Sequence, residues 1–370
     1  MSVDKLTTLR QHLQTAGLDL MIISDPAAIS YYLNIEFDPL ERLWLFLVPI
    51  DGTPTLIANE LFVFDEPSDV DVLWVKDGDE PLACFKETGL LPEDEPRAIG
   101  VDKRLIADHL LPLIEAFPQF SFKVASELVD NQRAVKTAEE QEKMRLASQI
   151  NDRAIERLIK EVIPYGVSEL EACDELLRIY KEEGANQGFS FDPIVAYGAN
   201  GADPHHESDD SRPQYGDAVV IDVGCRNDFY CSDMTRTVYY GEPSEEAKKV
   251  YQITLEAQER GLKAAKVGAP LSSVDLAGRD YITEQGYGQY FTHRIGHFIG
   301  RETHEHGDVS SVNDTLIESG NCFSVEPGIY LPGNTAVRIE DLLIAQPDGP
   351  EVLNHYTKEL QIIEPKTKPE

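Results

Sequence analysis

Hydrophobic positions in the first third of the chain alternate between helical and strand-like spacing. Three leucines recur at helical intervals between Asp4 and Ala16, and Gly17 ends that pattern. A second helix is predicted over residues 104–117. The short apolar runs between them are typical of buried strands: LDLMIIS, LWLFLVPI, TPTLIA, DVLWV and RAIGV. This alternation predicts an α/β domain over residues 1–130.

The pattern changes near residues 129–136, where longer amphipathic helices begin. Helices and hairpins then follow in runs, without strict βαβ alternation, which predicts an α+β domain over residues 137–370. The helix that begins near residue 244 is expected to continue to about Lys266. N-terminal caps indicate three helix starts, two of them with complete capping boxes: Thr137 with Glu140, Ser168 with Glu171, and Ser244.

Composition excludes several classes of partner. The chain has 66 acidic and 33 basic residues, a formal net charge of −33, and no Lys/Arg-rich run. Nucleic acids and anionic membrane surfaces would both be repelled by such a protein. The longest apolar run, residues 43–50, is too short to cross a bilayer, and the N-terminus lacks the apolar stretch of a signal peptide. Five cysteines without a CxxC pair favour reduced thiols, and we expect a cytoplasmic protein.

The segment GDAVVIDVGCRNDFYCSDMTRTVYYG has the pattern of a β-hairpin. A two-residue turn at Asn227–Asp228 places Asp222 directly opposite Asp233, with Cβ atoms roughly 4.5–5.5 Å apart. Two bare carboxylates at that separation repel each other and lose hydration. We therefore expect that one of them is protonated or that a cation lies between them.

A second hairpin has the same arrangement. In NCFSVEPGIYLPGNTAVRIEDLLIA, a loop centred on Gly333 pairs Glu326 with Glu340, although a bulge could shift either register by one residue. In so acidic a chain, any one of these carboxylates could simply be a solvated surface group. Two independent hairpins with opposed acidic pairs make that explanation much weaker.

Histidines supply the third feature. The segment THRIGHFIGRETHEH contains His293, His297, His304 and His306, and its Ile295 and Gly296 disfavour the helix of an HExxH zinc site. Carboxylates with imidazole suit Mn²⁺, Co²⁺, Fe²⁺ or Zn²⁺, and four carboxylates balance two divalent ions. The pattern alone does not decide which histidine binds metal, because a single histidine is more often a hydrogen-bonded core residue.

The ordered motifs DVG, SDMTRT, HRIGHFIG, SVEPGIY and VRIED resemble the metallopeptidase family of prolidase, aminopeptidase P and methionine aminopeptidase. The first domain is similar to the N-terminal domain of prolidases. The resemblance implies an α/β N-terminal domain followed by an α+β "pita-bread" catalytic domain and a homodimer. It also implies two divalent ions, with Mn²⁺ favoured, bridged by Asp233 and Glu340. The implied metal ligands are Asp222, Asp233, His297, Glu326 and Glu340.

The resemblance further implies hydrolysis of Xaa-Pro dipeptides by a metal-bridging hydroxide, with Glu326 as the proton shuttle. His205, His293 and His304 match the family's active-site histidines, which hold the substrate and stabilise the oxyanion. Arg338 shares a strand face with Glu340 and is expected to orient it, and Tyr330 is expected to support the site likewise. Each of the two could instead make an ordinary structural hydrogen bond. Two aromatic residues fall where relatives line the substrate pocket, although core packing is the commoner fate of such residues: Phe191 and Tyr230.

Two positions leave the substrate and the assembly open. Asp308 stands where some similar prolidases carry a basic residue for the dipeptide carboxylate, which puts strict dipeptide preference in doubt. The loop with Asp38, Glu41 and Arg42 corresponds to one that reaches the partner's site in related dimers, although it could be a solvated turn. The alternative functions are an aminopeptidase P-like enzyme, another C–N hydrolase on this scaffold, and a non-catalytic peptide-binding relative.

Overall fold

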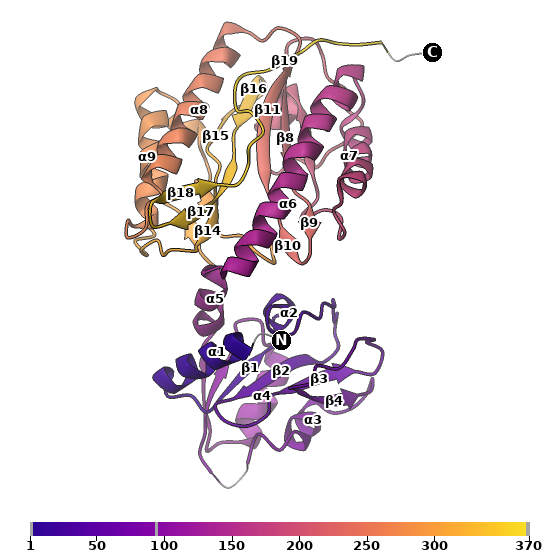
Figure 1. The fold of residues 1–370 in the computed structure, drawn as a ribbon, viewed down its shortest axis with the longest axis vertical. Coiled ribbons are helices and arrows are strands. Elements are labelled where there is room, and N and C mark those ends of the chain that lie inside the picture. Colours follow the sequence, from indigo (N-terminus) through magenta and orange to yellow (C-terminus); the bar gives the residue numbers. More distant parts are fainter. Residues whose placement is uncertain (1–2, 93–94, 368–370) are drawn as a thin grey trace. The chain divides into compact units, whose positions relative to one another are not determined.

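The computed structural model describes residues 3–92 and 95–367. The chain divides into two compact units, one ending at Arg133 and the other beginning at Ala134 (Figure 1). Each unit has its own hydrophobic cores.

The first unit is a mixed β-sheet with a hydrophobic core on each face. Its strand order is β4-β3-β2-β1-β5-β6. In β1, Met21 and Ile23 pack with α1 and α2, whereas Leu20 and Ile22 pack with α3 and α4 on the other face. The elements are α1 (Val3–Ala16), β1 (Leu20–Ile23), α2 (Pro26–Leu33), β2 (Trp44–Pro49), β3 (Thr55–Asn59), β4 (Asp71–Val75), α3 (Pro81–Glu87), β5 (Ala98–Val101), α4 (Ala107–Ala116), β6 (Ser121–Val124) and α5 (Glu127–Ala134).

This arrangement confirms the predicted α/β class. The five strand-like runs all form strands of the one sheet. The helix predicted over residues 104–117 begins later, at Ala107. The side chain of Asp102 accepts the backbone N–H of Arg104 at 2.7 Å, which holds the residues before the helix in a turn.

The second unit places pairs of helices on either side of its strands (Figure 1). Both predicted capping boxes are present, at Thr137 and at Ser168, and Ser244 caps α8. That helix ends at Ala264, slightly before the expected end. The helical elements are α6 (Ala138–Arg157), a π-helical turn (Leu158–Val162), 3₁₀ turns (Ile163–Tyr165, Gly198–Ala202, Gly288–Tyr290), α7 (Glu169–Glu183), α8 (Glu245–Ala264) and α9 (Leu271–Glu284).

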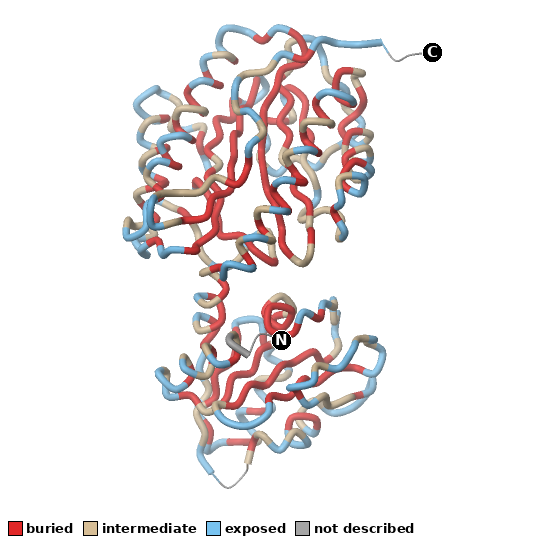
Figure 2. The backbone as a smooth tube through the Cα atoms, viewed as in Figure 1, coloured by how far each residue is buried: buried red, intermediate tan, exposed pale blue. Residues whose placement is uncertain are grey.

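Most strands of the second unit are buried between these helices (Figure 2). The sheet β19-β11-β8-β7 packs against α6 and α7, while the strands β14 to β17 pack against α8 and α9. This confirms the predicted α+β class. The strands are β7 (Ile194–Tyr197), β8 (Asp217–Val223), β9 (Arg226–Asn227), β10 (Tyr230–Cys231), β11 (Met234–Tyr240), β12 (Gly296–His297), β13 (Asp308–Val309), β14 (Cys322–Val325), β15 (Gly328–Leu331), β16 (Thr335–Arg338), β17 (Asp341–Gln346), β18 (Gly349–Val352) and β19 (Ile362–Ile363).

The two hairpins differ in how well their registers were predicted. The second has the predicted register, with Gly328 opposite Arg338 and Val325 opposite Asp341, so Glu326 and Glu340 face each other between two ladders. In the first hairpin the predicted register was wrong by two residues, because Asp222 pairs with Thr235. The turn lies at Asp228–Phe229, where both residues have positive φ.

Candidate metal centre and substrate cavity

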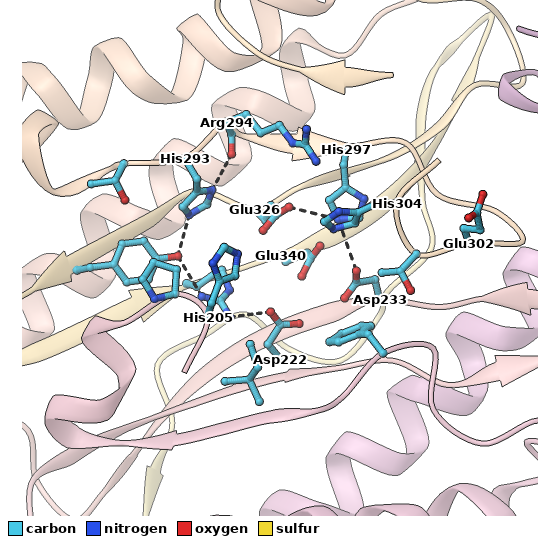
Figure 3. A pocket seen from close by; sticks show the side chains of 17 residues that line it. His205, Asp222, Asp233, His293, Arg294, His297, Glu302, His304, Glu326 and Glu340 are labelled. Atoms are coloured by element: carbon cyan, nitrogen blue, oxygen red, sulfur yellow. Dashed lines mark hydrogen bonds and ion pairs between the residues drawn. The ribbon is translucent and has the colours of Figure 1, made fainter. Parts of the chain in front are cut away.

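A cavity of about 1050 Å³ opens between the strands of the second unit (Figure 3). It brings together most of the residues that the sequence singled out, from segments more than 130 positions apart. The predicted residues in its lining are Phe191, His205, Asp222, Asp233, His293, His297, His304, Glu326, Tyr330, Arg338 and Glu340.

The period-2 geometry of the hairpins aims the carboxylates into the cavity. In β8, Ile221 and Val223 pack into the core with α6 and α7, so Asp222 faces the other way. The two-residue shift in register keeps Asp233 on the same face, as a diagonal neighbour of Asp222. Glu340 belongs to the second hairpin, and Oγ1 of Thr235, in β11 of the first hairpin, donates a 2.8 Å hydrogen bond to its Oε2 and fixes that carboxylate.

His297 lies in β12 rather than on a helix, as predicted. Its backbone N–H donates to Oγ of Ser324 at 3.0 Å, and that hydroxyl donates in turn to Oε1 of Glu326 at 3.2 Å. The preceding Gly296 has no room for a side chain, because a Cβ there would lie 1.9 Å from the carbonyl oxygen of Ser324. Close approach of the two strands therefore sets the position of the imidazole.

The imidazole of His297 presents an unprotonated nitrogen to two carboxylates. Burial, followed by the neighbouring His304, lowers the pKa of His297 to about 3. Its Nδ1 lies 3.2 Å from the carbonyl oxygen of Phe298, an acceptor, so we assign the proton to Nδ1. The free Nε2 then lies 3.6 Å from Oδ2 of Asp233 and 3.4 Å from Oε1 of Glu326. Three acceptors that face one another in this way are stable only when a cation lies between them or a carboxylate is protonated.

Buried carboxylate oxygens without hydrogen-bond partners also indicate a cation site. Among the described residues, Oδ1 of Asp222, Oδ1 of Asp233 and Oε1 of Glu340 are buried and have no hydrogen-bond partner. Burial, followed by the charges of neighbouring carboxylates, raises the pKa of Asp233 and of Glu340 well above the usual range. Burial also raises the pKa of Glu326 to about 7, although Arg338 opposes this. Such groups are stable as anions only beside cations.

The donor set fits divalent metal ions. One ligand atom from each of Asp233, His297 and Glu340 lies within 4.8 Å of the others, which is close enough to hold one ion. Asp222 and Glu326 lie outside this trio but line the same cavity. Carboxylate and imidazole ligands suit Mn²⁺, Co²⁺, Fe²⁺ and Zn²⁺.

Arg338 has a different partner from the one predicted. Its Nη2 donates to Oδ2 of Asp222 at 2.6 Å, and its Nε and Nη1 donate to Thr235 and Tyr330. No hydrogen bond joins it to Glu340 in the described part of the chain. Arg338 and Glu340 do share a strand face, but the long guanidinium crosses to β8, where the carboxylate of Asp222 lies.

Tyr330 links Arg338 to His293. Its hydroxyl accepts from Nη1 of Arg338 at 3.0 Å and lies 2.8 Å from Nε2 of His293. The Nδ1 of His293 lies 2.7 Å from the carbonyl oxygen of Arg294. Burial, followed by the charge of Arg338, lowers the pKa of His293 to about 4, so the imidazole is neutral. We therefore assign the proton to Nδ1 and the Tyr330 proton to the bond with Nε2.

The other two histidines lie on loops at the cavity. The ring of His304 is 4.0 Å from the ring of His297, between centroids, and burial lowers the pKa of His304. His205 is exposed and follows the 3₁₀ turn after β7. Both are labelled in Figure 3.

Of the two predicted pocket aromatics, Phe191 lines the cavity but Tyr230 does not. The hydroxyl of Tyr230 donates a buried 2.7 Å hydrogen bond to Oε1 of Glu140, and its ring packs in a separate small core. The other position of doubt, Asp308, also lies outside the lining, and its Oδ1 accepts from Nδ2 of Asn313 at 3.2 Å. Neither Tyr230 nor Asp308 is therefore placed to contact a substrate in the cavity.

The sequence reasoning missed several residues of the site. Arg294 is exposed and lines the cavity, and its side chain makes no hydrogen bond or ion pair with any described residue. Arg294 belongs to the HRIGHFIG motif, but no local sequence pattern indicated that its guanidinium would remain unpaired. The hydroxyls of Thr235 and Ser324 hold the predicted metal ligands in place. Apart from lying close to those ligands in the sequence, neither residue belongs to a pattern that indicates this role.

Two protein-family models match the chain. Residues 142–347 match the model of metallopeptidase family M24, and residues 5–135 match the creatinase/prolidase N-terminal domain. An uncharacterized peptidase of Staphylococcus aureus (strain USA300) is 35% identical over 359 residues, covering 96% of this chain and 99% of that protein.

Solved structures agree over nearly the whole chain. A prolidase from Thermococcus sibiricus superposes with a TM-score of 0.89 at 31% identity, covering 98% of this chain and 99% of that one. An Xaa-Pro dipeptidase from Bacillus anthracis superposes with a TM-score of 0.87 at 33% identity, covering 98% and 100%. The expected pita-bread fold is thereby confirmed.

Proposed function

Because the chain belongs to metallopeptidase family M24 and carries the creatinase/prolidase N-terminal domain, we propose that it hydrolyses Xaa-Pro dipeptides with two bound divalent metal ions. The observation that supports this most directly is the convergence of four carboxylates and one neutral imidazole in one cavity, three of whose buried oxygens have no partner among the described residues. The likeness to a prolidase and to an Xaa-Pro dipeptidase supports the substrate class.

The residues that would hold the ions are Asp222, Asp233, His297, Glu326 and Glu340. Mn²⁺ is the proposed metal, and Co²⁺, Zn²⁺ or Fe²⁺ would suit the same donors. When bound, such a pair of ions lowers the pKa of a water molecule and polarises the scissile carbonyl.

Glu326 is proposed to carry the proton to the leaving proline nitrogen. It has a carboxylate oxygen beside the Nε2 of His297, and burial raises its pKa to about 7, which supports a role as proton carrier. The hydroxyl of Ser324 holds the same carboxylate in place.

The histidines and Arg294 are proposed to bind the substrate. His205, His293 and His304 line the cavity beside the acidic cluster and are placed to hold the substrate and stabilise the oxyanion. The guanidinium of Arg294 is suited to the carboxylate of a dipeptide. Phe191 offers an apolar wall to the substrate side chains.

Metal removal tests the mechanism. Hydrolysis of Met-Pro should stop when a chelator is added and return with Mn²⁺ or Co²⁺. The variant Asp233→Asn should fold but fail to bind metal, as measured by calorimetric titration. Hydrolysis that resists the chelator would refute the two-metal proposal.

Substrate length tests the specificity. Turnover of Met-Pro should exceed turnover of a Met-Pro-Xaa tripeptide at equal concentration. The reverse ranking would identify an aminopeptidase P-like enzyme. An absence of turnover in the metal-loaded protein, together with measurable peptide binding, would instead identify a non-catalytic relative.

We also propose a cytoplasmic homodimer. Five cysteines without a disulfide suit a reducing compartment, and no described helix is long and apolar enough to span a membrane. Leu40, Leu61 and Val63 of the first unit are 71%, 64% and 88% exposed, which suits an interface. The loop of Asp38, Glu41 and Arg42 is included in that surface, although Arg42 pairs with Asp77 of its own unit. Light scattering of the purified protein tests the assembly, and a monomer would refute it.

A further inference from the structure

A second group of titratable residues lies outside the cavity, at the N-terminus of α7. Glu169, His206 and Asp209 present ligand atoms within 4.8 Å of one another, so the group could be mistaken for another metal site. Glu169 is fully buried and His206 is half-buried. The hydrogen bonds of Glu169 decide what the group does.

Both oxygens of the Glu169 carboxylate are already filled by donors from one loop. Oε1 accepts from the backbone N–H of Tyr197 at 2.8 Å and from Nδ2 of Asn200 at 2.9 Å. Oε2 accepts from Nε2 of His206 at 2.7 Å and from the backbone N–H of Asp209 at 3.0 Å. A carboxylate with four donors needs no cation.

The donors flank His205, which lines the cavity. The carboxylate and carbonyl oxygens of Asp203 accept the backbone N–H groups of His205 and His206, which closes a tight turn. Within that turn, His206 is bound to Glu169 while its neighbour His205 is presented to the cavity (Figure 3).

We propose that Glu169 is the positioning residue for His205: one buried carboxylate fixes residues 197–209 at four points, and thereby sets where the His205 imidazole meets the substrate. The effect on turnover rests on the proposed function, in which His205 contacts the substrate. The effect on the loop does not.

The substitution Glu169→Gln tests this with nearly the same shape. The amide has one acceptor oxygen and one NH₂ group, so it leaves part of the four-donor set unmatched. Two backbone bonds, from Glu169 to Ser211 and from Leu170 to Asp209, still join the loop to α7, so the chain should fold. Glu171→Gln is the matched control, because it alters a carboxylate of the same helix that accepts the backbone N–H of Ser168 and pairs with Arg212.

Hydrogen exchange measures how firmly residues 197–209 are held, independently of catalysis. Amide exchange at residues 197–209 should accelerate at least tenfold in Glu169→Gln and stay unchanged in Glu171→Gln. Unchanged exchange in Glu169→Gln would overturn the proposal. The variant should also hold as many metal ions per chain as the parent protein, and the loss of one ion would show a metal site instead.

Kinetics then test whether Glu169 acts through His205. In Glu169→Gln, kcat/KM for Met-Pro should fall roughly 10–100-fold, the size of effect expected when a contact group is misplaced. In a His205→Ala background the same substitution should change kcat/KM less than twofold. Equal losses in both backgrounds would overturn the proposal. If the parent protein does not hydrolyse Met-Pro, the proposed function fails, but the exchange measurement still tests whether Glu169 fixes residues 197–209.

Discussion

Glu326 allows a sharp test of the electrostatics of the acidic cluster in the metal-free protein. Its carboxylate is buried among other carboxylates and beside the imidazole of His297. Burial first, and then the charge of Asp222, raises its pKa from 4.5 to about 7, against the opposing charge of Arg338. Glu326→Gln keeps the shape of the side chain and removes the titration.

The sign and size of the effect follow from linkage. The unfolded chain ionises this group near pH 4.5, whereas the folded chain keeps it protonated until about pH 7. Below pH 4.5 the raised pKa of Glu326 therefore costs the folded state nothing, and the folded state loses stability as the pH rises to 7. Each pH unit in that window is worth about 1.4 kcal/mol, so the loss is about 3 kcal/mol. The buried histidines act in the opposite direction at lower pH, so a difference between variants is needed.

The assay is urea denaturation of the chelator-treated protein at several pH values between 4.5 and 8. The stability of the parent protein minus that of Glu326→Gln should fall by about 3 kcal/mol across this range, and then stay level. A difference that is constant with pH, or that rises, would refute the assigned pKa and its cause. With excess Mn²⁺ the dependence should disappear or reverse, because bound cations favour the ionised carboxylates.

Three further substitutions test the supporting structure. Lys136→Met breaks a buried 2.9 Å ion pair with Glu305, and denaturation should show a loss of about 3–5 kcal/mol. The exposed pair of Lys160 is the control, and Lys160→Met should change stability little. Gly296→Ala forces a Cβ to within 1.9 Å of a backbone oxygen, so calorimetry should detect no metal binding; normal affinity would refute the close approach. Tyr330→Phe should lower kcat/KM roughly 10–100-fold while metal content is retained, and unchanged kinetics would contradict its supporting role.

The sequence predicted the fold class and the grouping of the acidic residues because both depend on periodicity. A shift of two residues leaves every side chain on its original face, so the wrong register of the first hairpin still placed Asp222 and Asp233 together. The second hairpin was predicted correctly because Gly333 marks the centre of its turn, where its φ is +69°.

Contacts between distant segments determined the turn of the first hairpin and the partner of Arg338, which the sequence pattern did not predict. The turn at Asp228–Phe229 departs from the local preference because side chains of Asn186 and Gln187 accept its two backbone N–H groups. The same holds for Arg338, which bonds to a carboxylate on another strand. Such pairings join segments 40 or more positions apart, and no local pattern encodes them.

All the residues that line the cavity belong to the part of the chain after residue 133. Substitutions in the first unit therefore alter none of the proposed metal ligands or proton carriers. A substitution in the first unit can therefore change the proposed chemistry only indirectly, through folding or assembly, and not by replacing a residue of the cavity.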